Sequence, residues 1–182
     1  MRPDHDFDTL ITERLRLRRS HPDDAETISA YRSDPDVHMH QGWDVTDVHG
    51  VRRDIEEMAG RVPGEHGGWV QFTVEERATG RLVGDVGIST AEDEPGVIKV
   101  GYTIAPASQG RGYATEAVEA LVAYAFEVLG ADIVRAYADA ANAPSIRVME
   151  KVGMRLMERF EGDDEDGHWF GVRYERHRTE GP

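Results

Sequence analysis

The chain has 182 residues, no cysteine and a formal net charge of −14 at pH 7. Its length suits one domain, and the absence of cysteine excludes disulfides, thiolate zinc sites and an acyl-cysteine intermediate. So negative a charge argues against nucleic-acid binding, because phosphate contacts need clustered Lys and Arg. It serves ordinary solubility or, as the alternative, attracts a cationic partner.

The first half of the chain predicts one strand, two helices and a hairpin. Alternating leucines and arginines predict the strand over residues 11–18. One helix is expected after Ser20, a possible cap, and ends at Asp34-Pro35; the second covers residues 48–58. The hairpin pairs residues 70–74 with 82–89.

The second half begins with a loop over residues 92–96 and a strand over 98–104. Apolar residues then recur at helical spacing over residues 114–128, which predicts an amphipathic helix of about four turns. A strand over residues 133–138 and a helix over 142–151 follow. Residues 154–160 and 169–177 are expected to pair as closing strands, and the acidic run 161–166 between them is interpreted as a solvated loop or the rim of a cation site.

A glycine-rich segment, Gln109-Gly110-Arg111-Gly112-Tyr113-Ala114, lies between the strand over 98–104 and the long helix. At a helix N-terminus the first N–H groups have no intrahelical partner and the macrodipole is positive, so a diphosphate can accept several hydrogen bonds. A Walker loop would need a lysine, and a dinucleotide fingerprint a glycine or alanine at Thr115. The segment is either another phosphate loop or a turn that binds nothing.

Three ordered motifs resemble the GNAT acyl-CoA N-acyltransferases. Gln109, Gly112 and Ala114, after Gly101-Tyr102-Thr103-Ile104, are similar to that superfamily's pyrophosphate loop. Residues 142–154 resemble its next block. Residues 12–18 resemble the opening strand of the ribosomal-protein N-terminal acetyltransferase-like (RimJ/RimL-type) branch, and together the resemblance covers roughly residues 10 to 176.

The resemblance implies an α+β fold with a mixed, mostly antiparallel twisted sheet of about seven strands, about four helices and a splayed central strand pair. It implies one domain over residues 1–182, with a core from about 10 to 176. We expect a cytoplasmic protein without a membrane partner, because the sequence has no apolar span and no signal-peptide pattern. Members of this branch often form homodimers.

The function implied by the resemblance is acyl-CoA-dependent N-acyl transfer, with acetyl-CoA as cosubstrate and no metal. The acceptor is a primary amine, either a protein N-terminal α-amine or a small amine such as an antibiotic. The alternative function is an acyl-CoA sensor without turnover. The implied cosubstrate-binding residues are Tyr102, Thr103, Ile104, Gln109, Gly110, Arg111, Gly112, Tyr113, Ala114, Thr115, Asn142, Ser145 and Lys151.

Ser145 is the residue implied to donate a proton to the departing CoA thiolate. Many relatives carry a tyrosine seven residues after the asparagine, but Met149 stands there and cannot donate. The alternative role of Ser145 is a helix cap, since serine is common at helix starts. Asn142 is expected to orient the cosubstrate or the serine.

The general base stays open at the level of the sequence. Lys99 and Gly171 occupy positions where relatives often carry acids, so Glu158 and His168 are the candidates, with ordered water as the alternative. The resemblance places the acceptor against three residues, His40, Trp43 and Tyr102. The pair of histidines in His38-Met39-His40 lacks a third ligand and is not expected to hold a metal.

Overall fold

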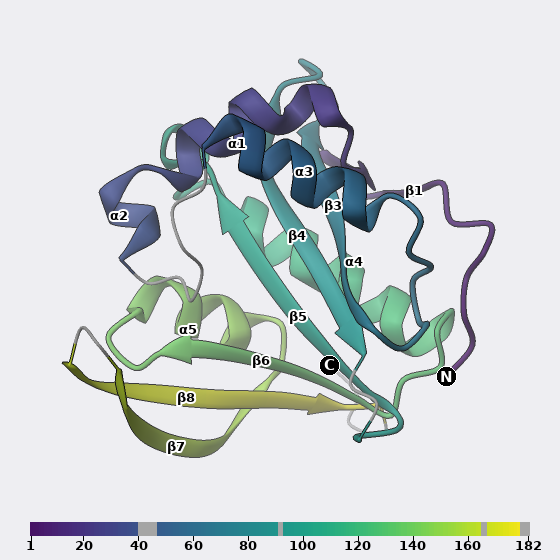
Figure 1. Cartoon of the computed structure of the whole chain (residues 1–182). Helices are drawn as coiled ribbons and strands as arrows, with labels where there is room; N and C mark the ends of the chain where they lie inside the picture. The colour runs from purple at the N-terminus through teal and green to yellow at the C-terminus, as the bar shows by residue number, and fades with distance from the viewer. Residues whose placement is uncertain (40–46, 91–92, 165–166, 179–182) are drawn as a thin grey trace.

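The computed structural model describes residues 1–39, 47–90, 93–164 and 167–178. In that part of the chain eight strands form one open sheet in the order β1-β2-β3-β4-β5-β6-β8-β7, accompanied by five α-helices (Figure 1). Neighbouring strands are antiparallel except β5 and β6, which run parallel. The predicted α+β class and mixed, mostly antiparallel sheet are confirmed, with one strand and one helix more than expected.

The strand predicted over residues 11–18 is wrong in its extent, because a hairpin stands there. β1 (Thr9–Ile11) and β2 (Leu15–Arg19) pair antiparallel on either side of Thr12. The Thr12 hydroxyl accepts a hydrogen bond from the N–H of Leu15 at 2.9 Å and donates one to the Glu116 carboxylate at 2.6 Å. Because Glu116 lies far along the chain in a helix, local pattern alone does not reveal this turn.

The first helix begins later than predicted. A 3₁₀ turn over Pro22–Asp24 comes first, with His21 rather than Ser20 as its N-cap, and α1 then spans Ala25–Arg32. The short helix α2 (Pro35–His38) follows it. The break predicted at Asp34-Pro35 thus separates two helices.

The second predicted helix is confirmed as α3 (Val48–Met58), capped by the Asp47 carboxylate. It packs with α1 on one face of the sheet (Figure 1). The contact is a small apolar cluster of Ala25, Ile28, Tyr31, Val51 and Ile55.

The central strands are β3 (Gly68–Glu76), β4 (Leu82–Thr90) and β5 (Val97–Ile104). The predicted helix after the glycine-rich segment is α4 (Tyr113–Glu127), and it covers the sheet face opposite α1 and α3 (Figure 1). The largest fully buried side chains between α4 and the sheet include Leu15, Leu17, Phe72, Ile88, Ile98 and Leu121.

The last part of the chain adds β6 (Ile133–Asp139), α5 (Ala143–Lys151), β7 (Arg155–Asp164) and β8 (Gly167–His177). β8 lies between β6 and β7, so the final hairpin forms one edge of the sheet. α5 packs beside α4 and β6. In Figure 1 β5 and β6 diverge from a common lower end, and this divergence positions the candidate site.

Candidate active site

A cavity of about 1270 Å³ runs along the divergence of β5 and β6. It extends from the N-terminus of α4, past β5 and α5, to α2 and α3 on the other face of the sheet. Pockets for small ligands typically measure roughly 300–1,000 Å³. This cavity therefore has room for a large cosubstrate and a second molecule.

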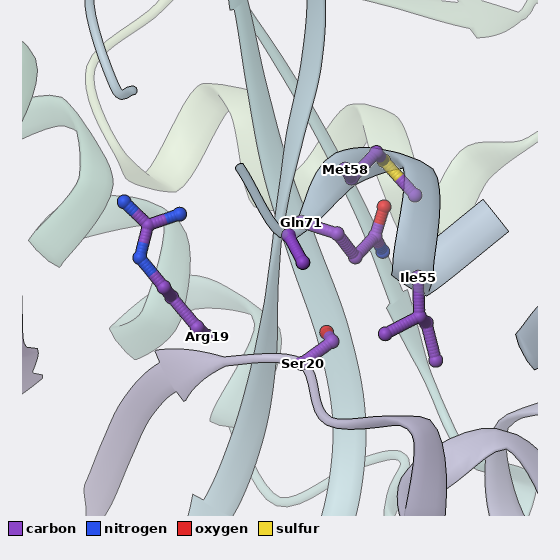
Figure 2. Close-up of a pocket in the computed structure, with 6 residues that line it drawn as sticks. Arg19, Ser20, Ile55, Met58 and Gln71 are labelled. Atoms are coloured by element: carbon purple, nitrogen blue, oxygen red, sulfur yellow. The ribbon is translucent and has the colours of Figure 1, made fainter. Parts of the chain in front are cut away.

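A second pocket is far smaller, at about 10 Å³, and Figure 2 shows the residues around it. It has space for about one water molecule. Met58 and Gln71 line both this pocket and the large cavity, so the two share a wall. The candidate ligand site is therefore the large cavity.

The divergence of the two strands begins after a short parallel ladder. β5 and β6 pair only from Val97 with Ile133 to Lys99 with Arg135. Beyond that point β5 stays paired with β4 as far as Ile104, while β6 stays paired with β8. This is the splayed strand pair that the resemblance implies.

The free edge of β5 presents backbone groups to the cavity. In an antiparallel pair the N–H and C=O groups of successive residues point alternately toward and away from the partner. Ala105 donates its N–H to Val83 of β4 at 2.9 Å, so the backbone groups of Val100, Tyr102 and Ile104 point toward the gap. The Gln109 side-chain amide donates to the Ile104 carbonyl there at 3.0 Å. An extended ligand can therefore bind this edge as an added strand.

The glycine-rich segment forms an open cradle at the start of α4. Gly110 and Gly112 have φ of 73° and 81°, in the left-handed region that favours glycine. A Cβ on Gly110 would meet nothing within 4 Å, and one on Gly112 would meet only the Arg14 guanidinium at 3.4 Å. Gly112 is the N-cap and offers no side-chain acceptor, so the first N–H groups of the helix remain for an anion.

Arg14, in the N-terminal hairpin, stabilises the conformation of this cradle. Its guanidinium donates to the Arg111 carbonyl at 2.9 Å and to the Glu116 carboxylate at 2.7 Å, and it lies over the Tyr113 ring at 4.9 Å. The loop is thereby held in place before any ligand binds. The Arg111 side chain is exposed and, unlike the other predicted loop residues, does not line the cavity.

α5 presents its N-terminal residues to the cavity. Asn142 is the N-cap, and its carbonyl oxygen accepts the N–H of Ser145 at 3.0 Å. The helix-cap alternative for Ser145 is therefore wrong. Arg147 and Lys151 line the cavity one turn apart, which places two cations where an anionic cosubstrate can meet them. Arg147 was missed in the sequence, although its spacing from Lys151 is the available signal.

Tyr102 and Ser145 meet inside the cavity. The Tyr102 hydroxyl lies 2.8 Å from the Ser145 hydroxyl and donates to the Ser145 carbonyl at 3.0 Å. Burial raises the pKa of Tyr102 to about 12, although the Ser145 hydrogen bond acts in the opposite direction. Tyr102 consequently keeps its proton at neutral pH.

The opposite end of the cavity has an aromatic floor. A Cβ on Gly87 or Gly101 would lie 3.2 or 3.3 Å from the Trp69 ring, so the indole rests across these two glycines of neighbouring strands. Trp69 is 40% exposed and lines the cavity. The charged side chains that line this end are Asp36, Asp54, Glu57 and Asp85, together with Arg32 and Arg61. The end is therefore net acidic.

Asp85 is the buried carboxylate of this end, with 3% of its side chain exposed. It accepts hydrogen bonds from Tyr31, Gln71 and Arg32, the last at 2.7 Å. Burial lowers the pKa of Arg32, but the Asp85 charge outweighs it and raises that pKa above its ordinary value. The pair joins α1 to β4 and fixes the wall of the cavity.

The structure does not bring the predicted base candidates to the cavity. Glu158 lies on the edge strand β7, half exposed and 3.2 Å from Arg173, and His168 pairs with Asp163 at 3.0 Å in the final hairpin. Neither is among the described residues that line the cavity, so geometry gives them no support as bases. His40 and Trp43 lie outside the described residues.

The departures from the usual GNAT pattern have structural reasons. Met149 is fully buried in the core, so this position offers no group to the cavity. A Cβ on Gly171 would lie 2.5 Å from the Phe160 ring, which occupies the space of a side chain there. Among the described residues, no group of three His, Asp or Glu side chains has the arrangement of a metal site, and no helix could span a membrane.

Comparisons with known proteins agree with this geometry. The family described as an acetyltransferase (GNAT) domain matches residues 14–155. An uncharacterized N-acetyltransferase, p20 of Bacillus licheniformis, is 31% identical over 150 residues, which are 82% of this chain and 83% of p20. The chain therefore belongs to the GNAT acetyltransferase family, whose members use acetyl-CoA.

Solved structures show the same fold. A GNAT-family acetyltransferase from Bacillus anthracis superposes with a TM-score of 0.83 at 26% identity, over 94% of this chain and 99% of the other. RimL, a ribosomal L7/L12 alpha-N-protein acetyltransferase in complex with coenzyme A, gives 0.80 at 13% identity, over 94% and 98%. The likeness to RimL shows the fold alone, and the RimJ/RimL-type branch stays a prediction.

Proposed function

We propose that this protein transfers the acetyl group of acetyl-CoA directly to the primary amine of a cationic acceptor. The observation that carries the proposal is the alignment of the glycine cradle, the free edge of β5 and Ser145 along one cavity. The cradle holds the diphosphate with the first N–H groups of α4, and Arg147 and Lys151 add charge. The edge of β5 holds the extended pantetheine arm by backbone hydrogen bonds.

The thioester supplies an activated acyl group, and the chain supplies position and polarity. The N–H of Ile104 faces the gap, where it can donate to the oxygen that becomes negative as the amine attacks. Ser145 lines the cavity beside this edge. In the proposed reaction its hydroxyl donates a hydrogen bond to the departing sulfur. Holding both reactants at attack distance contributes several kcal/mol on its own.

The acceptor enters from the side of α2 and α3. There the Trp69 ring and three carboxylates, Asp36, Asp54 and Glu57, face the cavity. An ammonium or guanidinium group is attracted both to an indole face and to carboxylates. This favours a basic protein N-terminus or a small polyamine-like molecule over a neutral amine.

The amine must be neutral when it attacks. An α-amine of pKa about 8 is roughly one-tenth neutral at pH 7, whereas a lysine-like amine of pKa about 10.4 is far less so. Water in the open acceptor end can take the proton, so no buried base is required for an α-amine. With such an acceptor kcat/KM rises with pH and levels off near the pKa of that amine.

The test is CoA thiol release from acetyl-CoA against N-terminal peptides, polyamines, aminoglycosides and amino acids, with product masses recorded. The expected result is turnover with one cationic class and none with the same peptides blocked at their N-terminus. The variant Glu57→Lys should raise KM for that acceptor and leave KM for acetyl-CoA unchanged. Tight binding of acetyl-CoA without turnover on any acceptor would contradict the proposal and favour the sensor alternative.

A further inference from the structure

We infer that Tyr102 is a positioning residue that sets the direction of the Ser145 hydroxyl toward the departing sulfur. The inference rests on the proposed function, in which Ser145 donates to that sulfur. The carrying observation is the double contact of the Tyr102 hydroxyl with the Ser145 hydroxyl at 2.8 Å and with the Ser145 carbonyl at 3.0 Å.

The two contacts define two hydrogen-bond arrangements. A tyrosine hydroxyl has one proton, a serine hydroxyl has one proton, and a carbonyl only accepts. When Tyr102 donates to the Ser145 carbonyl, the Ser145 proton bridges the two hydroxyls and points at Tyr102. When Tyr102 donates to the Ser145 hydroxyl instead, the serine proton is free to point into the cavity. A small rotation of one O–H bond therefore changes the role of Ser145.

Elements far apart in the chain fix this pair. Tyr102 belongs to β5, held by its ladder with β4, and Ser145 sits at the start of α5, where Asn142 caps the helix through the Ser145 N–H at 3.0 Å. The backbone of Ser145 is thus fixed, and only its hydroxyl remains to turn. A rigid phenol opposite a fixed serine is the arrangement that sets a hydroxyl direction.

Tyr102 retains its proton during this step. Burial raises its pKa to about 12. A thiol has an unperturbed pKa near 8.5, so the sulfur does not remove the phenol proton. In the balanced reaction the C–S bond breaks, the N–C bond forms, and the proton lost by the amine ends on the CoA thiol. The two hydroxyls stabilise the transient thiolate by donating hydrogen bonds in series.

The experiment compares four variants, Tyr102→Phe, Ser145→Ala, their double variant and Tyr124→Phe. Tyr124 is the matched control, because its hydroxyl binds Asp4 at 2.7 Å and lies outside the described cavity lining. Kinetics are measured with acetyl-CoA and the acceptor that the thiol-release panel identifies. A second readout needs no turnover: the pKa of the CoA thiol bound to each variant, from thiolate absorbance after subtraction of the desulfo-CoA complex.

Tyr102→Phe should lower kcat at least about tenfold and leave KM for acetyl-CoA unchanged, as expected for loss of an interaction made only in the transition state. The double variant should be no slower than Ser145→Ala, because both changes disrupt the same hydrogen-bonded pair of hydroxyls. The pKa of the bound thiol should rise equally in Tyr102→Phe and Ser145→Ala and stay unchanged in Tyr124→Phe.

Three results would overturn the inference, and they are distinct from failure of the proposed function. The first is that the reductions in kcat of the two single variants multiply in the double variant. The second is that the pKa of the bound thiol rises in Ser145→Ala but not in Tyr102→Phe. The third is full activity of Ser145→Ala, which removes Ser145 from the step. If the unaltered protein binds acetyl-CoA and turns over no acceptor, the proposed function fails instead.

Discussion

Replacing Asp85 with Asn removes a charge that a buried network is built around. Asp85 accepts hydrogen bonds from Tyr31, Gln71 and Arg32. Asparagine has nearly the same shape, but its NH₂ group meets donors and Arg32 loses its ion pair with Asp85. Breaking one side of a buried ion pair typically destabilises a protein by about 3–5 kcal/mol.

The exposure of the two partners sets where in that range the effect falls. The Arg32 side chain is 16% exposed and borders the cavity, whereas the Asp85 side chain is 3% exposed. Arg32 can turn partly toward water and keeps the attraction of Asp54, so we expect the lower end, about 3 kcal/mol for Asp85→Asn. In a chain of this length that corresponds to a fall in Tm of roughly 6–12 °C.

The assay is urea and thermal unfolding of Asp85→Asn, Arg32→Met and the double variant. Removing both charges leaves neither unpaired, so the double variant should be more stable than the sum of the single effects predicts, by about 1 kcal/mol or more. Binding of CoA should persist in Asp85→Asn, because the glycine cradle lies at the other end of the cavity. A loss below 0.5 kcal/mol in Asp85→Asn would refute the reasoning (about the size of a neutral surface change).

Gly112→Glu places a residue with a side chain in the left-handed backbone region and adds a negative charge to the cradle. Calorimetry should therefore show at least about a tenfold loss of CoA affinity. Gly60→Glu, at a glycine with open space and no positive φ, should bind CoA normally. Arg147→Gln should raise KM for acetyl-CoA, whereas Arg159→Gln, outside the described lining, should not; equal effects would remove Arg147 from the site. Burial raises the pKa of Glu75, but hydrogen bonds from neighbouring arginines outweigh it and lower that pKa below 4.5. The stabilisation that Glu75 contributes is therefore complete above about pH 4.5 and is lost as the pH falls through its lower pKa in the folded state. A urea midpoint that stays constant as the pH is lowered from 4.5 would contradict this.

The parts of the site that the sequence predicts are those that local rules determine. The cradle depends on glycines beside a helix start, so it is visible in one stretch of chain. The free edge of β5 is implied only by the family resemblance, because it depends on where the distant strand β6 diverges. Asn142 and Pro144 likewise predict the start of the helix α5. These residues needed no knowledge of the rest of the fold.

The parts that the sequence does not reveal depend on contacts between distant segments. The bond between Tyr102 and Ser145 joins β5 to α5, and the turn at Thr12 depends on Glu116 of α4. The Trp69 floor requires two glycines from neighbouring strands in register. Periodicity describes one element at a time, so such pairings appear only when the sheet is assembled.

The three-residue ladder between β5 and β6 leaves the sheet joined across its middle by little backbone pairing. A cosubstrate lying along the free edge of β5 would act as an additional strand. It would fill the gap between the part of the sheet that ends at β5 and the part that begins at β6. Ligand at one hundred times its dissociation constant adds about 2.7 kcal/mol to the free energy of unfolding. The thermal stability of this protein and its resistance to proteolysis should therefore increase with the concentration of acetyl-CoA.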